Sequence, residues 1–241
     1  MDAVEEPGER DLGALRDPDR LVAAQDAIGG LQPRPWRPGP APLLAAGCFV
    51  AFARGEQGPG RAGDHAWVGT AMVVEPGVET ATALTAGTAD APYRPGLLAL
   101  REGRMLLDGL RALLAAAPTS PDVVLVDATG RDHPRRCGLA LHLGYLLDLP
   151  SVGVTHRLLS DRHAGPPALT ARGHRRDVLV GGEAVAAWIC SREGARPVVA
   201  HAGWRTDVDA AVEVVLRTSG SARTPEPLRT ARRVAREARS R

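Results

Sequence analysis

The sequence predicts an α/β protein with a mixed sheet, in which three antiparallel strands are followed by parallel strands, and with helices on both faces. Three apolar runs of strand length, 42–52, 66–75 and 78–86, lie near the N-terminus, and their close succession predicts the antiparallel start. Beyond residue 96, helical patterns alternate with short apolar runs, which is typical of parallel strands connected by helices. A chain of 241 residues can bury a sizeable core, so we expect one main domain.

The N-terminal part begins with a helix. Residues 17–30 have helical spacing, Asp17 is a candidate N-cap, and Pro18 suits the first helical position. Mostly polar residues precede this helix, so we expect residues 1–16 to be disordered. Five prolines within 31–42 predict an extended connector to the first strand.

Helices and strands alternate in the rest of the chain. Leucines recur at helical spacing over 97–117, which predicts a long amphipathic helix. The apolar run 123–128 indicates an interior parallel strand. The further expected elements are a helix over 135–149, a strand over 151–155, a hairpin over 177–191 around Gly181-Gly182, a strand over 197–203 and a helix over 206–218.

Composition and charge exclude several classes of protein. No run approaches the 18 apolar residues of a membrane span, and the acidic N-terminus does not resemble a secretory signal. The three cysteines form no CxxC pair, so we expect neither a zinc site nor a disulfide framework. We therefore expect a cytoplasmic protein without a membrane partner, and a monomer by default.

The C-terminal segment is strongly basic, although the net charge of the chain is only +2. Between Arg223 and Arg241 there are seven arginines and two acids, Glu226 and Glu237. Such a segment either binds phosphates as an arm or forms a solvated helix. We expect a basic tail over 221–241, outside a domain that spans 17–220.

Two carboxylates are candidates for a metal site. Asp127 comes at the carboxyl end of the predicted strand 123–128, where open α/β sheets usually bind ligands. Glu102 lies in the first turns of the 97–117 helix, away from most of its leucines. Together they are able to share Mg²⁺, a hard cation that prefers oxygen ligands. The alternative is that Asp127 is a turn residue at the strand end and Glu102 a solvent-exposed carboxylate.

The residues that follow Asp127 suggest phosphate binding. Thr129-Gly130 allows close approach of the backbone to a ligand. His133, Arg135 and Arg136 then lead into a predicted helix, whose N-terminus attracts phosphate oxygens.

The order of these motifs resembles the endonuclease V family. The resemblance is densest in PYRPG (92–96), REG (101–103) and VDATGRDHPRRCGLALHLGYLLDLPSVGV (126–154), and it extends over about 17–220. It implies a ribonuclease H-like fold. It also implies a DNA-repair activity, in which Mg²⁺ or Mn²⁺ supports cleavage of the second phosphodiester bond 3′ to a deaminated base. The implied partner is DNA or RNA that contains such a base, usually the hypoxanthine of inosine.

The resemblance also implies a site for the deaminated base. In the family a PYxPG wedge holds the strands apart, and a proline-stiffened loop with an aromatic side chain suits the replacement of a base that leaves the stack. The wedge residues here are Pro92, Tyr93, Arg94, Pro95 and Gly96. Backbone around Gly96, Gly130, His133 and Gly138 would line the base pocket. Ala128 stands where the family usually has glycine, and its methyl group would crowd the base.

The resemblance implies five polar active-site positions, and this sequence keeps the family's residue at two of them. Glu102 and Asp127 match the family's helix and strand carboxylates and would be both catalytic residues and metal ligands. In AGCFVAF the position of the first-strand aspartate is Phe49, and the usual lysine is replaced by His156, which is still able to donate to a phosphate. Trp204 in AGWRTDVD replaces a histidine. We therefore expect weakened metal binding and impaired cleavage, with Asp132 or Asp207 as candidate replacement ligands.

Three functions remain open at this level. The first is an endonuclease that still cleaves nucleic acid at inosine. The second is a non-catalytic descendant that binds nucleic acid or a deaminated base. The third is a pocket for a nucleoside-like small molecule, with Phe49 and Trp204 as aromatic walls.

Overall fold

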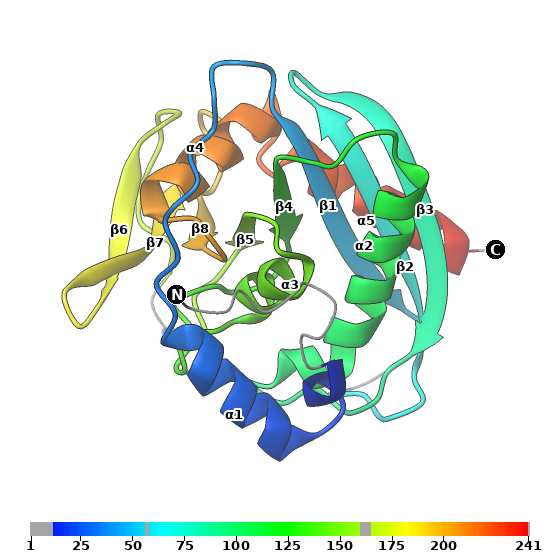
Figure 1. Cartoon of the computed structure of the whole chain (residues 1–241). Helices are drawn as coiled ribbons and strands as arrows, with labels where there is room; N and C mark the ends of the chain where they lie inside the picture. Colours follow the sequence, from blue (N-terminus) through cyan, green and yellow to red (C-terminus); the bar gives the residue numbers. More distant parts are fainter. Residues whose placement is uncertain (1–11, 56–57, 160–164, 241) are drawn as a thin grey trace, which may run out of the picture.

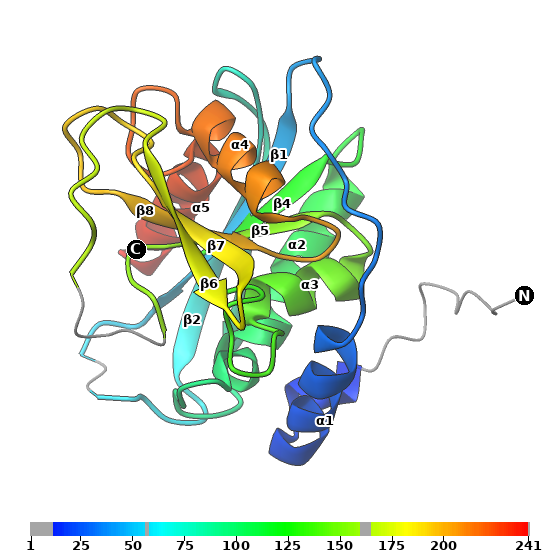
Figure 2. The same cartoon turned by 90° about the vertical axis from the view of Figure 1, so that its left-hand side faces the viewer.

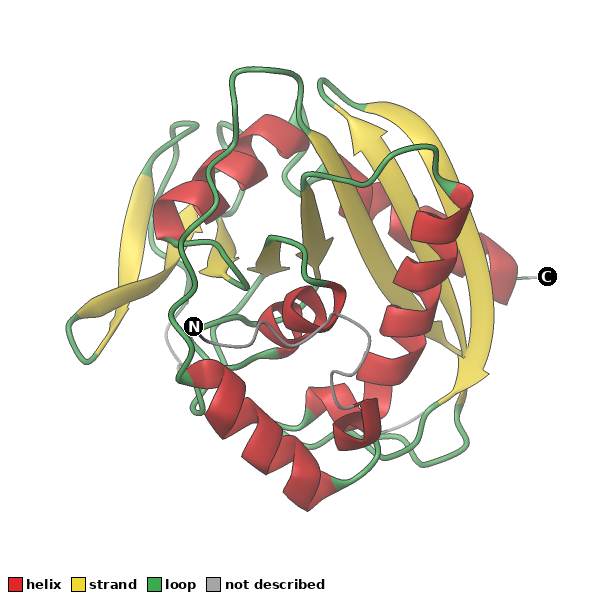
Figure 3. Cartoon of the chain, viewed as in Figure 1, coloured by secondary structure: helices red, strands yellow, loops and turns green. Residues whose placement is uncertain are grey.

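The computed structural model describes residues 12–55, 58–159 and 165–240, which form one eight-stranded sheet with helices on both faces (Figure 1, Figure 3). The strand order is β3-β2-β1-β4-β5-β8-β7-β6. The strands are β1 (Leu44–Phe52), β2 (His65–Val74), β3 (Val78–Thr88), β4 (Val123–Val126), β5 (Ser151–Thr155), β6 (Arg175–Val180), β7 (Glu183–Ile189) and β8 (Val198–Ala202). The helices are η1 (Leu12–Leu15), α1 (Pro18–Gly29), η2 (Ala99–Gly103), α2 (Arg104–Ala116), α3 (Leu139–Leu147), α4 (Val208–Ser219) and α5 (Glu226–Arg239).

Strand directions confirm the predicted start of the sheet and correct its end. Strands β1, β2 and β3 are antiparallel, and β4 and β5 run parallel to β1 and β4 respectively. Strand β8 is antiparallel to both β5 and β7, contrary to the expected parallel continuation, whereas the antiparallel pair β6 and β7 is the predicted hairpin. The short link between β7 and β8 explains why these two strands are antiparallel, because adjacent parallel strands need a crossover of a dozen or more residues. The β6–β7 hairpin lies at the sheet edge that faces the viewer in Figure 2.

Two helical layers cover the sheet, as the sequence predicted. Side chains alternate between the two faces of a strand, so neighbouring residues belong to different cores. Ala46 and Val124 pack in the cluster that contains the leucines of α2 and α3. Ala45 and Val123 pack in the cluster that contains the valines of α4 and Leu228 of α5. Figure 1 shows α2 in front of the strands and α5 behind them.

The segment predicted as a basic tail is a helix of the domain. Helix α5 lies across β1 and β2, with Leu228 and Ala231 buried. Two strand glycines make the close approach possible: a Cβ on Gly47 would stand 2.5 Å from the carbonyl carbon of Pro227, and one on Gly69 would stand 2.2 Å from the carbonyl oxygen of Ala231. The described domain therefore continues beyond the predicted boundary at 220.

The predicted boundaries also change near the N-terminus and near the site. Residues 1–11 lie outside the described residues, but 12–15 form the short helix η1, in which Leu15 is buried. The predicted helix over 97–117 opens with the π-helical turn η2 before α2. Helix α3 begins at Leu139 instead of residue 135, because the preceding residues form a turn in which Arg136 has a φ of 57°. None of the described helices is long and apolar enough to cross a membrane.

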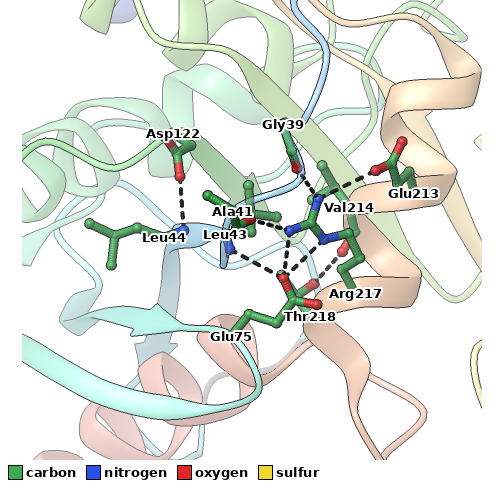
Figure 4. Close-up of polar contacts among 10 residues, drawn as sticks. All are labelled: Gly39, Ala41, Leu43, Leu44, Glu75, Asp122, Glu213, Val214, Arg217 and Thr218. Carbon is green, nitrogen blue, oxygen red and sulfur yellow. Dashed lines mark hydrogen bonds and ion pairs between the residues drawn. The ribbon is translucent and has the colours of Figure 1, made fainter.

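An ion pair fixes the proline-rich connector against α4 (Figure 4). The Arg217 guanidinium donates to Glu75 Oε2 at 2.6 Å and to the carbonyl oxygens of Gly39 and Ala41 at 2.7 and 2.6 Å. Glu75 in turn accepts the N–H of Leu43, just before β1. The Arg217 hydrogen bond holds the pKa of Glu75 below its usual value. The extended connector that the prolines predicted is thus held where β1 enters the sheet.

Candidate nucleic-acid site

A pocket of about 340 Å³ lies at the carboxyl ends of β4 and β5. Its walls come from segments that are distant in the sequence: the predicted wedge, the start of η2, the β4–α3 connection and the residues after β5. They include Tyr93, Gly96, Leu98, Ala99, Asp127, Ala128, Thr129, His133, Leu139, Thr155 and Arg157. We call this cavity the base pocket. Its volume is within the usual range of small-molecule sites.

The carbonyl group of Gly96 anchors the wedge to the base pocket. Its oxygen lies 3.0 Å from His133 Nε2 and accepts hydrogen bonds from Arg135 Nη2 at 2.8 Å and Gln25 Nε2 at 3.3 Å. Arg135 Nε also donates to Gln25 Oε1 at 2.8 Å. Gly96 has a φ of 78°, which favours glycine. Helix α1 and the turn before α3 therefore fix the last wedge residue together.

The remaining wedge residues lie beside this anchor. Tyr93 is 37% exposed and lines the base pocket, and its N–H donates to the carbonyl of Pro59 at 2.7 Å. Pro92 and Pro95 flank it in a segment without regular structure. A tyrosine held at the mouth of a pocket is able to stack on a nucleobase.

Two of the predicted phosphate-binding arginines are engaged within the protein. The Arg135 guanidinium donates hydrogen bonds to Gly96 and Gln25, as described above. Arg136 forms an ion pair with Glu183 at the start of β7. Both side chains therefore position loops in this structure.

Gly130 and Gly138 have a structural reason to be glycine. A Cβ on Gly130 would stand 2.0 Å from the carbonyl oxygen of Ala202, and one on Gly138 would stand 2.3 Å from that of Thr129. The N–H of Gly138 donates to the carbonyl of Gly130 at 2.9 Å. These two residues shape the turn behind the base pocket, whereas Gly96 and His133 line it.

The two predicted carboxylates do come together. Glu102 from η2 and Asp127 from the end of β4 line one cavity of about 270 Å³ with Cys48 and Phe49 of β1. Burial, followed by the nearby charge of Asp127, raises the pKa of Glu102 to about 7. The half-buried Glu102 is thus not a freely solvated carboxylate.

An arginine from α5 occupies the other side of Asp127. Arg232 Nη2 donates to Asp127 Oδ2 at 3.0 Å. The Arg232 guanidinium also lies over the Phe49 ring, 4.8 Å from its centroid, and that of Arg236 lies 5.8 Å from the same centroid. Phe49 and Asp127 directly follow the last registered pair of β1 and β4, Cys48 with Val126. The place of a third carboxylate is therefore held by an aromatic ring with cations on it.

A divalent metal ion does not fit this set of residues. Mg²⁺ requires near-octahedral oxygen ligands, and Phe49 supplies none. Asp127 already has the permanently charged Arg232 as its counter-ion. Within 12–55, 58–159 and 165–240, no group of three or more His, Cys, Asp or Glu side chains is placed to hold a metal.

The two candidate replacement ligands are engaged elsewhere. Asp132 is buried and its Oδ1 lies 2.7 Å from Nδ1 of the fully buried His201. Asp207 caps α4 by accepting the N–H of Ala210 at 2.9 Å, and it forms an ion pair with Arg37. Neither side chain lines the cavity of the two carboxylates.

The other two replaced positions are His156, which lies near the site, and Trp204, which does not. His156 is half-buried close to the site, and burial, followed by the charge of Arg223, lowers its pKa. Trp204 was wrongly expected at the site: it is 7% exposed and packs against Tyr145, with ring centroids 5.0 Å apart. The backbone N–H of Trp204 donates to Ser151 Oγ at 2.9 Å. Trp204 thus belongs to a small core beside α3 and is not a wall of the base pocket.

Sequence reasoning missed Arg232 and Arg236. Both lie in the segment that was predicted as a tail, so nothing linked them with Asp127, 105 residues earlier in the chain. The available signal was the recurrence of arginine at positions 229, 232, 233 and 236, which is one face of a helix.

A mixed sheet of this order, with a pocket at the carboxyl ends of its central strands, defines a protein of the ribonuclease H-like fold. The chain belongs to the endonuclease V family, because the model of that family matches residues 44–233. This family consists in general of metal-dependent nucleases.

Individual relatives agree with this assignment. An endonuclease V from Roseiflexus is 38% identical over 173 residues, which are 71% of this chain and 75% of the relative. The crystal structure of endonuclease V from Streptomyces avermitilis is 30% identical, with a TM-score of 0.76 and 92% of each chain covered. A Ciona intestinalis endonuclease V, solved with DNA containing an inosine, shares the fold at 20% identity, with a TM-score of 0.77 over 92% of this chain and 97% of that one.

Proposed function

We propose that this protein recognises a deaminated base, the hypoxanthine of an inosine nucleotide, in a DNA or RNA strand and binds it without metal-dependent cleavage. The observation that carries the proposal is the contrast within one site. The wedge is anchored to the base pocket through Gly96, whereas Asp127 is paired with Arg232 and lines a cavity with Phe49.

The chemistry of the base pocket supports recognition of a purine. Its walls combine apolar surface from Leu98 and Leu139 with the polar groups of Thr155 and His133. Burial lowers the pKa of His133, and both of its ring nitrogens are engaged within the protein: Nε2 lies 3.0 Å from the carbonyl oxygen of Gly96, and Nδ1 accepts the N–H of Arg135 at 3.2 Å, so the ring is a fixed wall of the pocket. A base that leaves a duplex loses its stacking partners, and Tyr93 is positioned to replace them.

Binding and cleavage, measured side by side, test the proposal. Purified protein is titrated with a labelled oligonucleotide that contains one inosine and with its guanosine counterpart. Mg²⁺ or Mn²⁺ is present in parallel reactions that are analysed for strand scission. We expect tighter binding to the inosine strand and no scission with either ion. Metal-dependent scission that Asp127→Ala abolishes would contradict binding without cleavage, and equal affinity for both strands would contradict base recognition.

The wedge anchor gives a further prediction. Arg135→Met keeps much of the side-chain volume but removes the donors to Gly96 and Gln25. The wedge then loses its charged anchor, so we expect the ratio of affinities for inosine and guanosine strands to fall by about tenfold. A loss of this size corresponds to the free energy of one charge-assisted hydrogen bond. Fluorescence anisotropy measures the ratio. Arg176→Met on the exposed strand β6 is the control and should leave the ratio unchanged; an unchanged ratio in Arg135→Met would refute the role of the anchor.

A further inference from the structure

Helix α5 forms a second cavity next to the two carboxylates. It has a volume of about 420 Å³ and lies between α5 and the residues that precede it. Five of its seven lining residues are arginines: Arg223, Arg229, Arg232, Arg233 and Arg236. We call this cavity the arginine cleft. Four of these arginines alternate along α5 with the buried residues that pack on β1 and β2, so their guanidinium groups are held by a docked helix.

The carboxylates of the protein only partly balance these charges. Three of the five are paired: Arg229 with Glu226, Arg233 with Glu79, and Arg232 with Asp127. Arg223 and Arg236 have no carboxylate partner among the described residues. Arg223 is held in place instead, because its Nε and Nη2 donate to the carbonyl oxygens of Arg196 and Pro197 at 2.6 and 2.9 Å. Burial and the charge of Arg196 lower the pKa of Arg223, as expected for a cation that lacks an anion.

The Arg232–Asp127 ion pair links the arginine cleft to the base pocket. Arg232 lines the cleft and binds Asp127, and Asp127 lines both the cavity of the carboxylates and the base pocket. Arg232 and Arg236 both lie over Phe49, which lines the same cavity as Glu102 and Asp127. A ligand that extends from the base pocket past Asp127 therefore reaches Arg232 and the cleft in which Arg223 and Arg236 have no carboxylate partner within the described part of the chain.

We propose that the arginine cleft binds a backbone phosphate of the strand whose deaminated base occupies the base pocket. Guanidinium groups bind phosphate oxygens through paired, planar N–H donors, and they need no metal ion to do so. Arg223 and Arg236 provide the free positive charge, and Arg232 links the cleft to Asp127. This proposal rests on the proposed function, since it assigns a phosphate site to the same strand.

A salt series with matched charge variants tests this site. The test variant is the double substitution Arg223→Gln and Arg236→Gln. The control is Arg16→Gln with Arg111→Gln, which removes the same charge from a separate cavity beside α2, on the opposite face of the sheet. Each protein is titrated with inosine and guanosine oligonucleotides at several salt concentrations.

We expect the test variant to lose about tenfold or more in affinity for both strands, because phosphate contacts carry no base information. The slope of log K against log salt should decrease by about 0.7 for single strands, the value for one lost phosphate contact. The control should keep the wild-type slope, and the inosine-to-guanosine ratio should stay constant in both variants.

The outcomes separate the two proposals. A wild-type slope in the test variant would overturn the arginine cleft as a phosphate site, whatever the inosine preference. A wild-type protein without inosine preference would overturn the proposed function, whereas a reduced slope would still support the cleft. Displacement of the oligonucleotide by micromolar inorganic phosphate at constant ionic strength would assign the cleft to the free ion and overturn a backbone site.

Discussion

The double variant Phe49→Asp with Arg232→Ala should bind Mn²⁺ and cleave inosine-containing strands that the wild type leaves intact. The new aspartate would join Asp127 and Glu102 at one cavity, and the loss of Arg232 would free Asp127 Oδ2. Three carboxylates on neighbouring elements are an oxygen-rich set of the kind that hard divalent cations prefer. We expect a gain in cleavage of several orders of magnitude, because metal ions activate water and stabilise developing charge.

The single variants show which obstacle is larger. Phe49→Asp alone leaves Arg232 on Asp127, and Arg232→Ala alone leaves an aromatic ring where an oxygen ligand is needed. Each should therefore gain much less than the double variant. Asp127→Asn added to the double variant should abolish the gain, and calorimetry with Mn²⁺ should follow the same order. A double variant that folds but neither binds Mn²⁺ nor cleaves would show that Phe49 and Arg232 are not what prevents metal binding.

Much of the fold followed from local patterns in the sequence. The antiparallel start, the parallel pair β4 and β5, the hairpin and the helices before residue 220 were recognisable from apolar periodicity and turn residues. The direction of β8 was not, because strand direction depends on which neighbour a strand joins. The docking of α5 was not predictable either, since it depends on Gly47 and Gly69 leaving room on two other strands.

The same distinction applies to the candidate site. Glu102 and Asp127 were singled out from their places at a helix start and a strand end, and Gly96 and His133 from the resemblance of their motifs to the family. Arg232 was missed because its contact with Asp127 is made only after α5 docks behind the sheet. Trp204 was wrongly expected at the site, because the position of a residue in a sequence motif does not show towards which core its side chain points.

A buried acid–imidazole pair behind the base pocket should have the largest effect on stability. Asp132 Oδ1 lies 2.7 Å from His201 Nδ1 and accepts the N–H of Gly130 at 3.0 Å. His201 Nε2 lies 2.8 Å from Thr155 Oγ1 in the wall of the base pocket. Asp132→Ala removes the carboxylate that faces Nδ1 of the fully buried His201, so we expect the free energy of unfolding to fall by about 3 kcal/mol. Urea unfolding at neutral pH measures it.

The loss caused by Asp132→Ala should depend on pH with a definite sign. Burial alone would raise the pKa of Asp132, but the adjacent His201 and the N–H of Gly130 lower it overall. A carboxyl group whose pKa is lower in the folded state stabilises the fold above its unfolded pKa, near 3.8, and loses that contribution as the pH falls through the folded value. The difference between wild type and Asp132→Ala should therefore be full at neutral pH and shrink in strong acid.

Matched variants separate the charge from the packing. Asp132→Asn keeps an acceptor for Gly130 and should recover part of the stability, whereas Asp177→Ala, on the exposed strand β6, should change it by less than about 0.5 kcal/mol. Because His201 also orients Thr155, Asp132→Ala should lower the preference for inosine strands even where the protein is fully folded. An Asp132→Ala protein as stable as Asp177→Ala would show that the buried pair contributes nothing net, and that the wall of the base pocket is held by packing alone.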